Sequence, residues 1–501
     1  MGRAGEIPPA MQRAAETADV IELRLDCLEE SERDIARGLL PEWLSQSGVP
    51  LIVTLRASEQ GGHAAIAADA RERFWTSVGK LPDVCLIDLE LDLIEKFANE
   101  EAILKLPVDW RVVICSHHDF TGMPADLDQI YERMAATPAG ILKIAVQAND
   151  ATDCLEVFSL LERAQHDHRE MIAIAMGQAG AATRILGPAR GSFLTYGSVD
   201  EASATAPGQL GAKDLRELYR IDQINRNTQI FGLMGRPVSH SISPQIQNSA
   251  FAAEGIDAVY LPFEVLDAGE FLRRMAHPES RELDWNLRGL SVTSPHKTAV
   301  METLDWIERA AKEIGAVNTI VVKGNELHGY NTDALGFISP LRSRFGALKD
   351  ARCAIIGAGG GARAALWALR NEGAQVGLFV RNVAAARSMA EEFGADCHGL
   401  AGAAFGGFDL VVNATPLGTA GAQEDKTAAT AAQLRNVRLA YDLVYNPLET
   451  HFLREARAAG NETLGGWEML VAQAVEQFRL WTGQTPRADK MSVAAMNALK
   501  K

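Results

Sequence analysis

Residues 353–363 read CAIIGAGGGAR, in which a short apolar run leads into glycines and then into the helical stretch AALWALRNEG. Glycines between a buried strand and a helix let the backbone approach a pyrophosphate, which the N–H groups of the helix N-terminus bind. A glycine pattern alone is weak evidence, but this one has both the strand and the helix that the motif requires. It predicts an α/β domain of the Rossmann type, with nucleotide contacts at Gly357, Ala358, Gly359, Gly360 and Gly361.

The end of the next apolar run, QVGLFVRN, bears on the choice of cofactor. It carries Arg381 and Asn382 where an acid would bind the ribose 2′-hydroxyl of NAD. An arginine at this place favours the 2′-phosphate of NADP. The alternative is that Arg381 is only a solvated residue at the end of a strand. We therefore predict NADP as the cofactor.

The bulk composition limits the classes of function. With 501 residues the chain is too long for one core, so two or three domains are expected. The composition is 47% hydrophobic and 23% charged, as in ordinary globular proteins. A net charge of -16 argues against nucleic acid or an anionic membrane as partner, and favours small-molecule substrates held by local basic groups.

The six cysteines are scattered and form no C-x-x-C pair. This favours reduced thiols over a disulfide framework or a metal site, so no metal is predicted. The N-terminus has no apolar signal core and no apolar run approaches membrane-spanning length. A soluble, cytoplasmic protein is expected, and its oligomeric state is left open.

The first part of the chain alternates short apolar runs with helical stretches, which is typical of repeated βα units. A (β/α)8 TIM-type barrel needs eight strands, and nothing before Met11 resembles a strand. We predict such a barrel with its first strand missing, joined to the second half by a polar helical connection at 208–228. The seven predicted strands are 20–26, 50–56, 84–91, 111–118, 141–147, 171–177 and 191–198.

Lys143 lies within the apolar stretch AGILKIAV (139–146) and has no acid beside it in sequence. An ammonium group there costs desolvation energy unless it is paired or loses its proton. The side chain could extend to water from a strand end. Alternatively, the amine could be kept partly neutral so that it attacks a carbonyl.

Polar side chains alternate along the neighbouring predicted strands, so each set shares one face. In a barrel, inward side chains near the carboxyl ends of the strands build the active site. A lysine, an imidazole, acids and arginines suit Schiff-base chemistry on a ketone that carries a carboxylate. A structural ion-pair network is the alternative. The polar residues are Glu22, Arg24, Asp26, Thr54, Arg56, Asp88, Glu90, His117, His118 and Asp119.

The first half resembles type I 3-dehydroquinate dehydratase through ELRLD, TLR followed by GG, DLEL, SHHDF, ILKIAV, GxxxR within GQAGAATR, and ATAPGQ. The resemblance implies that Lys143 is the Schiff-base lysine and His118 the general acid/base, with His117 a non-catalytic neighbour. The sequence departs from the family pattern at Gln60, where Glu is common, and at Thr205, where Ser is usual. The implied substrate contacts are Glu22, Arg24, Arg56, Arg184, Thr205 and Gln209.

Three loops upstream of the glycine motif carry hydroxyl and amide groups: SHSISP (239–244), SVTSPHK (291–297) and GAVNTI (315–320), followed by GYNTD (329–333). Such groups suit a small ligand rich in hydroxyls. Lys297 alone would be assigned to the surface. Together with Asp333 and a dinucleotide fold, it forms an acid/base pair that can move the proton of an alcohol during hydride transfer.

The second half resembles shikimate dehydrogenase through SxSP, VTxPHK, GAVNT, NTD, GAGGGAR, NATPLG, DLVYNP and GGWEMLVAQ. Ile242 replaces a common Lys, Ser291 a common Asn, and Val380 and Asn382 flank Arg381 where Asn and Thr are usual. The resemblance implies catalysis by Lys297 with Asp333. The implied contacts are Ser241, Ser243, Thr293, Asn318, Asp333, Tyr445 and Gln473 with shikimate, and Gly357 to Gly361, Arg381, Thr415, Leu443 and Gly466 with NADP.

These features predict a bifunctional enzyme in the order found in plants. The dehydratase barrel would occupy 1–222, the shikimate-binding domain 229–337 plus 468–501, and the NADP domain 338–467. Successive reactions would convert 3-dehydroquinate to 3-dehydroshikimate and then to shikimate. Two alternatives stay open: a dehydrogenase that also acts on quinate, and a first half that binds ligand as a sensor or scaffold without reacting.

Overall fold

The computed structural model describes residues 2–78, 85–98, 108–199 and 208–500. The chain divides into two compact units, Met1–Asn227 with Phe263–Val265, and Thr228–Pro262 with Leu266–Lys501. Within the described ranges, no helix has both the length and the hydropathy to cross a membrane.

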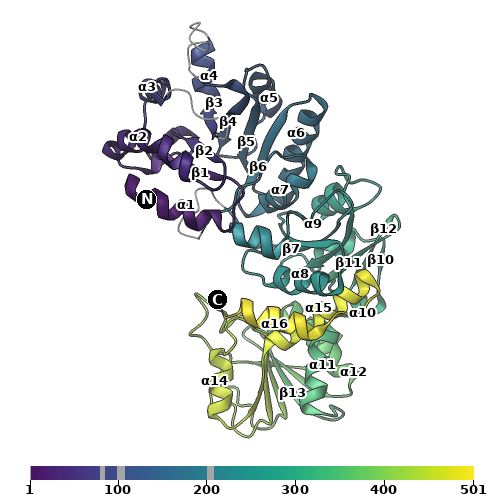
Figure 1. The fold of residues 1–501 in the computed structure, drawn as a ribbon. Helices are drawn as coiled ribbons and strands as arrows, with labels where there is room; N and C mark the ends of the chain where they lie inside the picture. The colour runs from purple at the N-terminus through teal and green to yellow at the C-terminus, as the bar shows by residue number, and fades with distance from the viewer. Residues whose placement is uncertain (1, 79–84, 99–107, 200–207, 501) are drawn as a thin grey trace. The chain divides into compact units, whose positions relative to one another are not determined.

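The first unit is built on a parallel sheet of six strands whose order in space is their order in the chain. This order is that of a TIM-type barrel, in which each strand pairs with the next. Figure 1 shows helices α4 to α7 packed along these strands. The strands are β1 Ile21–Arg24, β2 Leu51–Thr54, β3 Cys85–Glu90, β4 Val113–Asp119, β5 Ile141–Gln147 and β6 Glu170–Met176. The helices are α1 Ile7–Ala15, α2 Glu30–Gln46, α3 Ala68–Val78, α4 Leu91–Ala98, α5 Leu127–Ala135, α6 Cys154–His166 and α7 Ala181–Leu186.

Alternation along the strands decides which side chains face the site. Ile52, Ile114, Ile141 and Ile172 form one apolar cluster on the inner face. Glu22, Asp88, His118 and Lys143 stand an even number of residues from, or pair directly with, these isoleucines. Their side chains therefore lie on the same face. The apolar cluster thus supports the carboxyl ends of the strands, where the polar side chains gather.

The predicted strand 191–198 is wrong as a regular strand. Within the described residues, this segment makes only isolated bridges, Met171 with Ser192 and Ser198 with Gly211. Residues 2–20 hold the short 3-10 helix η1 (Ala4–Glu6) and α1 and no strand, in agreement with the predicted absence of a first strand.

The predicted helical connection at 208–228 is also largely wrong. Its only helix among the described residues is the five-residue π-helix η10, Asp214–Leu218. Arg220 has a φ of 52°, in the left-handed region, which takes the chain out of the helical path.

The second unit contains two sheets. The first is mixed, with the order β10-β12-β11-β9-β7-β8, and β11 runs antiparallel to both of its neighbours. Its strands are β7 Gln229–Gly235, β8 Ala258–Glu264, β9 Leu287–Val292, β10 Trp306–Ile307, β11 Thr319–Lys323 and β12 Glu326–Tyr330. Its helices are α8 Ser243–Glu254, α9 Ala268–Phe271 and α10 Arg309–Ile314.

The second sheet of this unit is wholly parallel, with the order β15-β14-β13-β16-β17-β18. This is the Rossmann order, and its topological switch point lies between β13 and β16. The strands are β13 Arg352–Ile356, β14 Gln375–Val380, β15 Asp396–Gly399, β16 Leu410–Asn413, β17 Leu439–Asp442 and β18 Glu462–Leu464. The helices are α11 Asp333–Phe345, α12 Gly360–Asn371, α13 Val383–Glu392, α14 His451–Ala458, α15 Gly466–Thr482 and α16 Ala488–Ala498.

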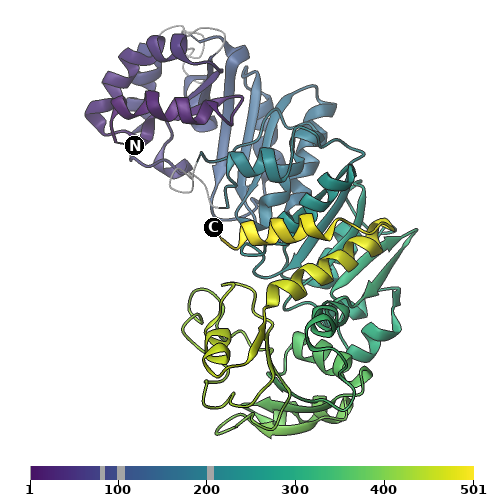
Figure 2. The same ribbon diagram turned by 60° about the horizontal axis from the view of Figure 1, so that its bottom comes forward.

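The C-terminal helices connect these two sheets. In Figures 1 and 2, α15 and α16 (yellow) run between the sheet that contains β7 and the sheet that contains β13. Met469 of α15 belongs to the core of the parallel sheet, whereas Val471 and Phe478 of the same helix belong to the core around β7 and α8. One helix therefore contributes to both cores, which ties the two halves of this unit together.

Candidate active sites

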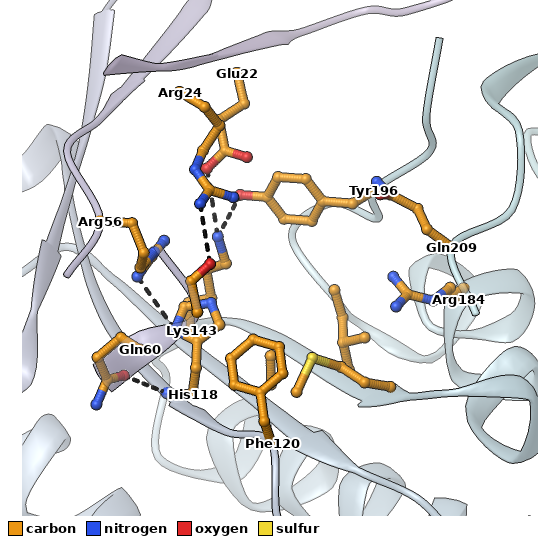
Figure 3. Close-up of a pocket in the computed structure, with 14 residues that line it drawn as sticks. Glu22, Arg24, Arg56, Gln60, His118, Phe120, Lys143, Arg184, Tyr196 and Gln209 are labelled. Carbon is orange, nitrogen blue, oxygen red and sulfur yellow. Dashed lines mark hydrogen bonds and ion pairs between the residues drawn. The ribbon is translucent and has the colours of Figure 1, made fainter. Parts of the chain in front are cut away.

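A pocket opens at the carboxyl ends of the strands of the first unit. Figure 3 shows Lys143 and His118 near its centre, with Arg184 and Gln209 across the pocket from Arg56 and Gln60. The lining residues are Glu22, Arg24, Arg56, Gln60, Gly61, His118, Phe120, Lys143, Ala145, Ile174, Met176, Arg184, Tyr196 and Gln209.

Lys143 is held by three groups around its amine. The side chain is 5% exposed, so its amine does not extend to bulk water. Nζ donates hydrogen bonds to Asp88 Oδ2 at 3.0 Å and to Tyr196 Oη at 3.0 Å. Glu22 Oε1 lies 3.7 Å from Nζ, and Thr54 donates to that same oxygen at 2.8 Å.

The expectation of a partly neutral Lys143 is wrong for this state of the site. Burial alone would lower the pKa of the amine, but the carboxylate of Asp88, the hydroxyl of Tyr196 and the carboxylate of Glu22 raise it above its usual value. The attraction to nearby anions outweighs the desolvation cost. Lys143 is therefore an ammonium until a reaction partner or a conformational step removes a proton.

Asp88 joins the cationic groups of the pocket. Its carboxylate accepts hydrogen bonds from Arg56 at 2.8 Å and from Ser116 at 2.6 Å, besides that from Lys143. Burial would raise the pKa of this carboxyl, but Arg56, Lys143 and His118 lower it well below its usual value. Asp88 therefore stays ionised and fixes the position of both cations.

His118 lies one inward position beyond Ser116 on β4, and Ser116 pairs with Lys143 on β5. Burial, followed by the charges of Arg56 and Lys143, lowers the pKa of the imidazole well below 6.5. Arg56 Nη1 lies 3.1 Å from His118 Nδ1, and a guanidinium only donates, so Nδ1 is the acceptor. This contact assigns the proton of the neutral ring to Nε2.

Three residues of this pocket that contact His118 or Lys143 were not predicted from the sequence or were noted only as departures from the family pattern. Gln60 Oε1 accepts from the backbone N–H of His118 at 2.7 Å. Phe120 stacks beside His118, with ring centroids 6.4 Å apart. Tyr196 reaches Lys143 from residues 191–198. The available signal was the spacing of Leu194 and Tyr196 by two residues, since both pack against the inner apolar cluster.

The other predicted polar residues lie close by but face different partners. Asp26 forms a bidentate pair with Arg24, at 2.9 and 2.8 Å, and accepts from the backbone of His63. Glu90 pairs with Arg71 at 2.5 Å and accepts from the backbone of Ala57. These two acids order the loops around the pocket. Thr205 lies outside the described residues.

A second cluster of reactive groups lies in the second unit. Lys297 Nζ donates to Asp333 Oδ2 at 2.5 Å, and Asn318 Nδ2 donates to Asp333 Oδ1 at 2.8 Å. Asp333 is the first residue of α11, where a carboxylate is favoured by the helix N-terminus. Lys297 follows β9 and Asn318 precedes β11, so the three side chains come from separate elements of one sheet region.

Hydroxyl and amide groups surround this pair. Ser241 donates to Ser243 at 3.1 Å, and the buried Tyr260 contacts Ser243 and donates to Ser291 at 2.7 Å. Ser291 in turn donates to Gln477 on α15 at 2.9 Å. Tyr260 and Gln477 were not predicted, and nothing in their local sequence marked them.

The remaining predicted polar residues enter from several loops. The methyl of Thr293 packs at Gly235, where an added Cβ would come within 2.2 Å. Thr332 contacts Gln473 at 3.5 Å, which brings α15 to the Asn318 region. Tyr445 is half-buried and packs against the apolar cluster around α8 and α15.

The glycine loop after β13 leaves no room for side chains where it meets its neighbours. Gly357 has a φ of 114°, and an added Cβ would lie 2.8 Å from the carbonyl oxygen of Ala414. Gly361 packs on Leu443, and an added Cβ on Gly466 would lie 2.5 Å from the Leu443 oxygen. The glycine loop after β13 and the loops after β16 and β17 therefore meet at the switch point of the sheet.

The space over this loop and its link to the acid/base pair suit a dinucleotide. An ideal Cβ on Gly359 would meet nothing within 4 Å, so the loop surface is open there. A Cβ on Gly360 would lie 3.7 Å from Cδ of Lys297, so the loop adjoins the acid/base pair. Thr415 is held by hydrogen bonds to Asn413, and Arg381 is exposed at the end of β14. These residues fit a phosphate-bearing cofactor.

Comparisons with known proteins agree with this arrangement. A family model described as type I 3-dehydroquinase matches residues 3–226. The models for the shikimate dehydrogenase substrate binding domain and the shikimate 5′-dehydrogenase C-terminal domain match 233–320 and 466–495. The chain is 32% identical over 494 residues to the chloroplastic bifunctional 3-dehydroquinate dehydratase/shikimate dehydrogenase of Arabidopsis thaliana, covering 93% of this chain and 78% of that protein.

The chain belongs to the bifunctional 3-dehydroquinate dehydratase/shikimate dehydrogenase family. Both family resemblances and their order along the chain are confirmed.

Further matches concern the second half of this family member. It is 40% identical over 277 residues to a shikimate dehydrogenase (NADP+) of Methanocella arvoryzae, covering 54% of this chain and 99% of that protein. A crystal structure of a shikimate dehydrogenase in complex with NADP+ covers 56% of this chain and 98% of its own, with 36% identity and a TM-score of 0.52. The predicted Rossmann fold is therefore confirmed as well.

Proposed function

We propose that this chain catalyses two successive reactions, the dehydration of 3-dehydroquinate to 3-dehydroshikimate and the NADPH-dependent reduction of that product to shikimate. The observation that carries the proposal is that Lys143, His118 and three arginines line one pocket. The second unit supports the reduction through the Lys297–Asp333 pair beside a glycine loop. Membership of the bifunctional family supports the pairing of the two activities.

In the dehydratase, Lys143 is proposed to form an imine with the ring ketone, which makes the imine carbon an electron sink. His118 then removes a proton from the adjacent carbon and returns it to the departing hydroxyl. Its Nδ1 is engaged by Arg56 without substrate, so Arg56 must release it first. A substrate carboxylate is the stronger partner for a guanidinium and provides the reason for this release.

The remaining residues of the pocket are proposed to bind the substrate. Arg184 is almost fully buried, and burial lowers the pKa of its guanidinium to about 10. Its guanidinium lines the pocket and suits a bidentate pair with a substrate carboxylate. Glu22, Arg24, Arg56 and Gln209 line the same space, and Thr205 is assigned to the site on the family resemblance alone.

In the dehydrogenase, Lys297 is proposed to donate the proton that the carbonyl oxygen needs as it becomes a hydroxyl, and Asp333 holds the ammonium in place. NADPH supplies the hydride when it is bound. Asn318 orients Asp333, and Ser241, Ser243, Thr293, Tyr445 and Gln473 would bind the hydroxyls and carboxylate of the substrate.

The cofactor is proposed to lie across the carboxyl edge of the parallel sheet. Gly357, Ala358, Gly359, Gly360 and Gly361 would contact the pyrophosphate, as the open loop surface allows. Arg381 would bind the 2′-phosphate. Thr415, Leu443 and Gly466 would contact the nicotinamide half, because their loops close the other side of the switch point.

The proposed domains follow from these sites. Residues 1–222 would be the dehydratase, 229–337 with 468–501 the shikimate-binding domain, and 338–467 the NADP domain. The family models at 3–226, 233–320 and 466–495 support the first two of these domains. We also propose a cytoplasmic location, supported by six free cysteines, none of which is paired in the described residues.

The experiment is a coupled assay on the full chain with 3-dehydroquinate and NADPH, with product identification, together with borohydride reduction in the presence of 3-dehydroquinate. We expect shikimate as the product and an adduct on Lys143. A chain that reduces 3-dehydroshikimate but neither dehydrates 3-dehydroquinate nor forms the adduct would have a first half that only binds ligand. Faster turnover with quinate than with shikimate in the reverse reaction would instead identify a quinate dehydrogenase.

A further inference from the structure

Tyr196 is a third group on the reactive amine, besides the two carboxylates. Its hydroxyl oxygen lies 3.0 Å from Lys143 Nζ, and the same nitrogen lies 4.3 Å from the centre of the phenol ring. Figure 3 shows the ring reaching across the pocket with its hydroxyl directed at the amine. Among the described residues that touch this nitrogen, Tyr196 is the one that can both accept and donate a proton while remaining neutral.

The state of this phenol follows from its surroundings. Burial raises the pKa of Tyr196; the ammonium of Lys143 lowers it, and the carboxylates of Glu22 and Asp88 raise it further. The net pKa lies above its usual value, so the hydroxyl keeps its proton. Asp88, in contrast, is held ionised by Arg56 and Lys143, which makes it a weak acceptor for a proton from Nζ.

Imine formation from an ammonium needs protons to be moved, although none is gained or lost overall. The ammonium carries three protons on nitrogen, and the protonated imine carries one. The other two must reach the oxygen of the former carbonyl, which then leaves as water. A group within hydrogen-bond distance of Nζ that accepts one proton while donating another meets this need.

We propose that Tyr196 is a further catalytic residue of the dehydratase, whose phenol relays a proton from Lys143 Nζ to the oxygen of the substrate carbonyl. The phenol oxygen accepts the proton from nitrogen as its own hydroxyl proton passes to the substrate oxygen, so Tyr196 ends each transfer unchanged. A second transfer along the same path completes the departing water and leaves the C=N bond. The proposal rests on the imine chemistry of Lys143 proposed above.

The test is Tyr196→Phe in the full chain, because phenylalanine keeps the ring over the ammonium and removes only the hydroxyl. The readout is the single-turnover rate of imine formation, measured by quenching with borohydride at increasing times. We expect this rate to fall about 10²-fold, the usual contribution of one acid/base group. The reductase activity of the same chain reports whether the variant is folded.

Tyr131→Phe is the matched control. Tyr131 donates its hydroxyl to the carboxylate of Asp167 at 2.9 Å and lies under the charge of Arg163, but it is on α5 and does not line the pocket. We expect its imine formation to match that of the unsubstituted chain. An imine rate for Tyr196→Phe within twofold of the unsubstituted chain, or an equal loss in Tyr131→Phe, would overturn the relay. Absence of any trapped adduct in the unsubstituted chain would instead overturn the dehydratase function itself.

Discussion

At the level of single side chains, the first pocket is a balance of charges rather than a neutral amine in an apolar strand. Arg56 and Lys143 share the buried Asp88, and both cations lower the pKa of His118. The imidazole is thus kept neutral by its cationic neighbours, and Lys143 is kept charged by its anionic ones. The same network that organises the site also sets the protonation states from which the reaction begins.

The low pKa of His118 predicts where dehydration loses activity in acid. A ring with a pKa below 6.5 takes up a proton only below that pH, so kcat/KM should hold as pH falls to 6.5 and drop only beyond it. Gln60→Glu would add a negative charge near the backbone of His118, raise the imidazole pKa and move the drop to higher pH.

Initial dehydration rates across this pH range, for the unsubstituted chain and for Gln60→Glu, check this prediction. The reductase activity measured on the same samples is the control for unfolding. A drop in kcat/KM that begins above pH 6.5 in the unsubstituted chain would contradict a neutral His118 at that pH. A drop at the same pH in Gln60→Glu as in the unsubstituted chain would contradict it as well.

Among the structural elements, the carboxyl ends of β16 and β17 are joined by a buried polar cluster. Asp442 accepts from Asn413 at 2.9 Å and from the backbone of Val444, and it contacts Thr450 at 2.5 Å. Thr450 caps α14, and Asn413 holds Thr415. Asp442 therefore connects the loops that are proposed to bind the cofactor, and no cation neutralises it among its hydrogen-bond partners in the described part of the chain.

This cluster predicts a stability that falls with rising pH. Burial raises the pKa of Asp442 from 3.8 to about 7, so the folded chain holds a proton that the unfolded chain releases. The free energy of unfolding should fall as pH rises from 3.8 to about 7, by about 1.4 kcal/mol for each unit of pKa difference. Asp442→Asn mimics the protonated carboxyl and should remove this dependence.

Denaturant unfolding of the second unit, followed at several pH values in that window, measures the effect. Asp396→Asn is the matched control, because Asp396 is an exposed carboxylate on β15 of the same sheet. We expect Asp442→Asn to be more stable than the unsubstituted chain above pH 7 and similar to it near pH 4. Parallel pH profiles for all three proteins would rule out a raised pKa at Asp442.

For the molecule as a whole, the two reactions are expected to be separable, because the pocket around Lys143 and the pair Lys297–Asp333 lie in different compact units. Lys143→Ala should lower dehydration by more than roughly 10³-fold and leave reduction unchanged. Lys297→Ala should lower reduction by roughly 10²- to 10⁴-fold and leave dehydration unchanged.

Separate assays of the two steps check this, with Lys213→Ala and Lys312→Ala as controls, because both are exposed lysines, one in each unit. Both controls should retain both activities. Loss of both activities in either Lys143→Ala or Lys297→Ala, in a chain that is still folded, would show that the sites are not independent.

The sequence by itself determined the family, the order of the two activities, the Rossmann sheet and half of the residues that line the first pocket. These features can be read from short motifs, because the strand, the loop and the helix start that form each motif follow one another directly in the chain. Alternation along 141–147 likewise places Lys143 on the inner face, together with Ile141 and Ala145. Only the tertiary structure decided the charge of Lys143 and the state of His118.

The reason is that these properties depend on residues far apart in the chain. Glu22 and Asp88 meet at Nζ of Lys143 because parallel strands bring their carboxyl ends together, and Tyr196 reaches the same nitrogen from the irregular segment 191–198. The strand predicted at 191–198 failed for a related reason, since pairing needs a neighbour that local sequence does not reveal. Electrostatic balance and strand pairing are both set by groups brought together across the fold, and so they appear only when the chain is folded.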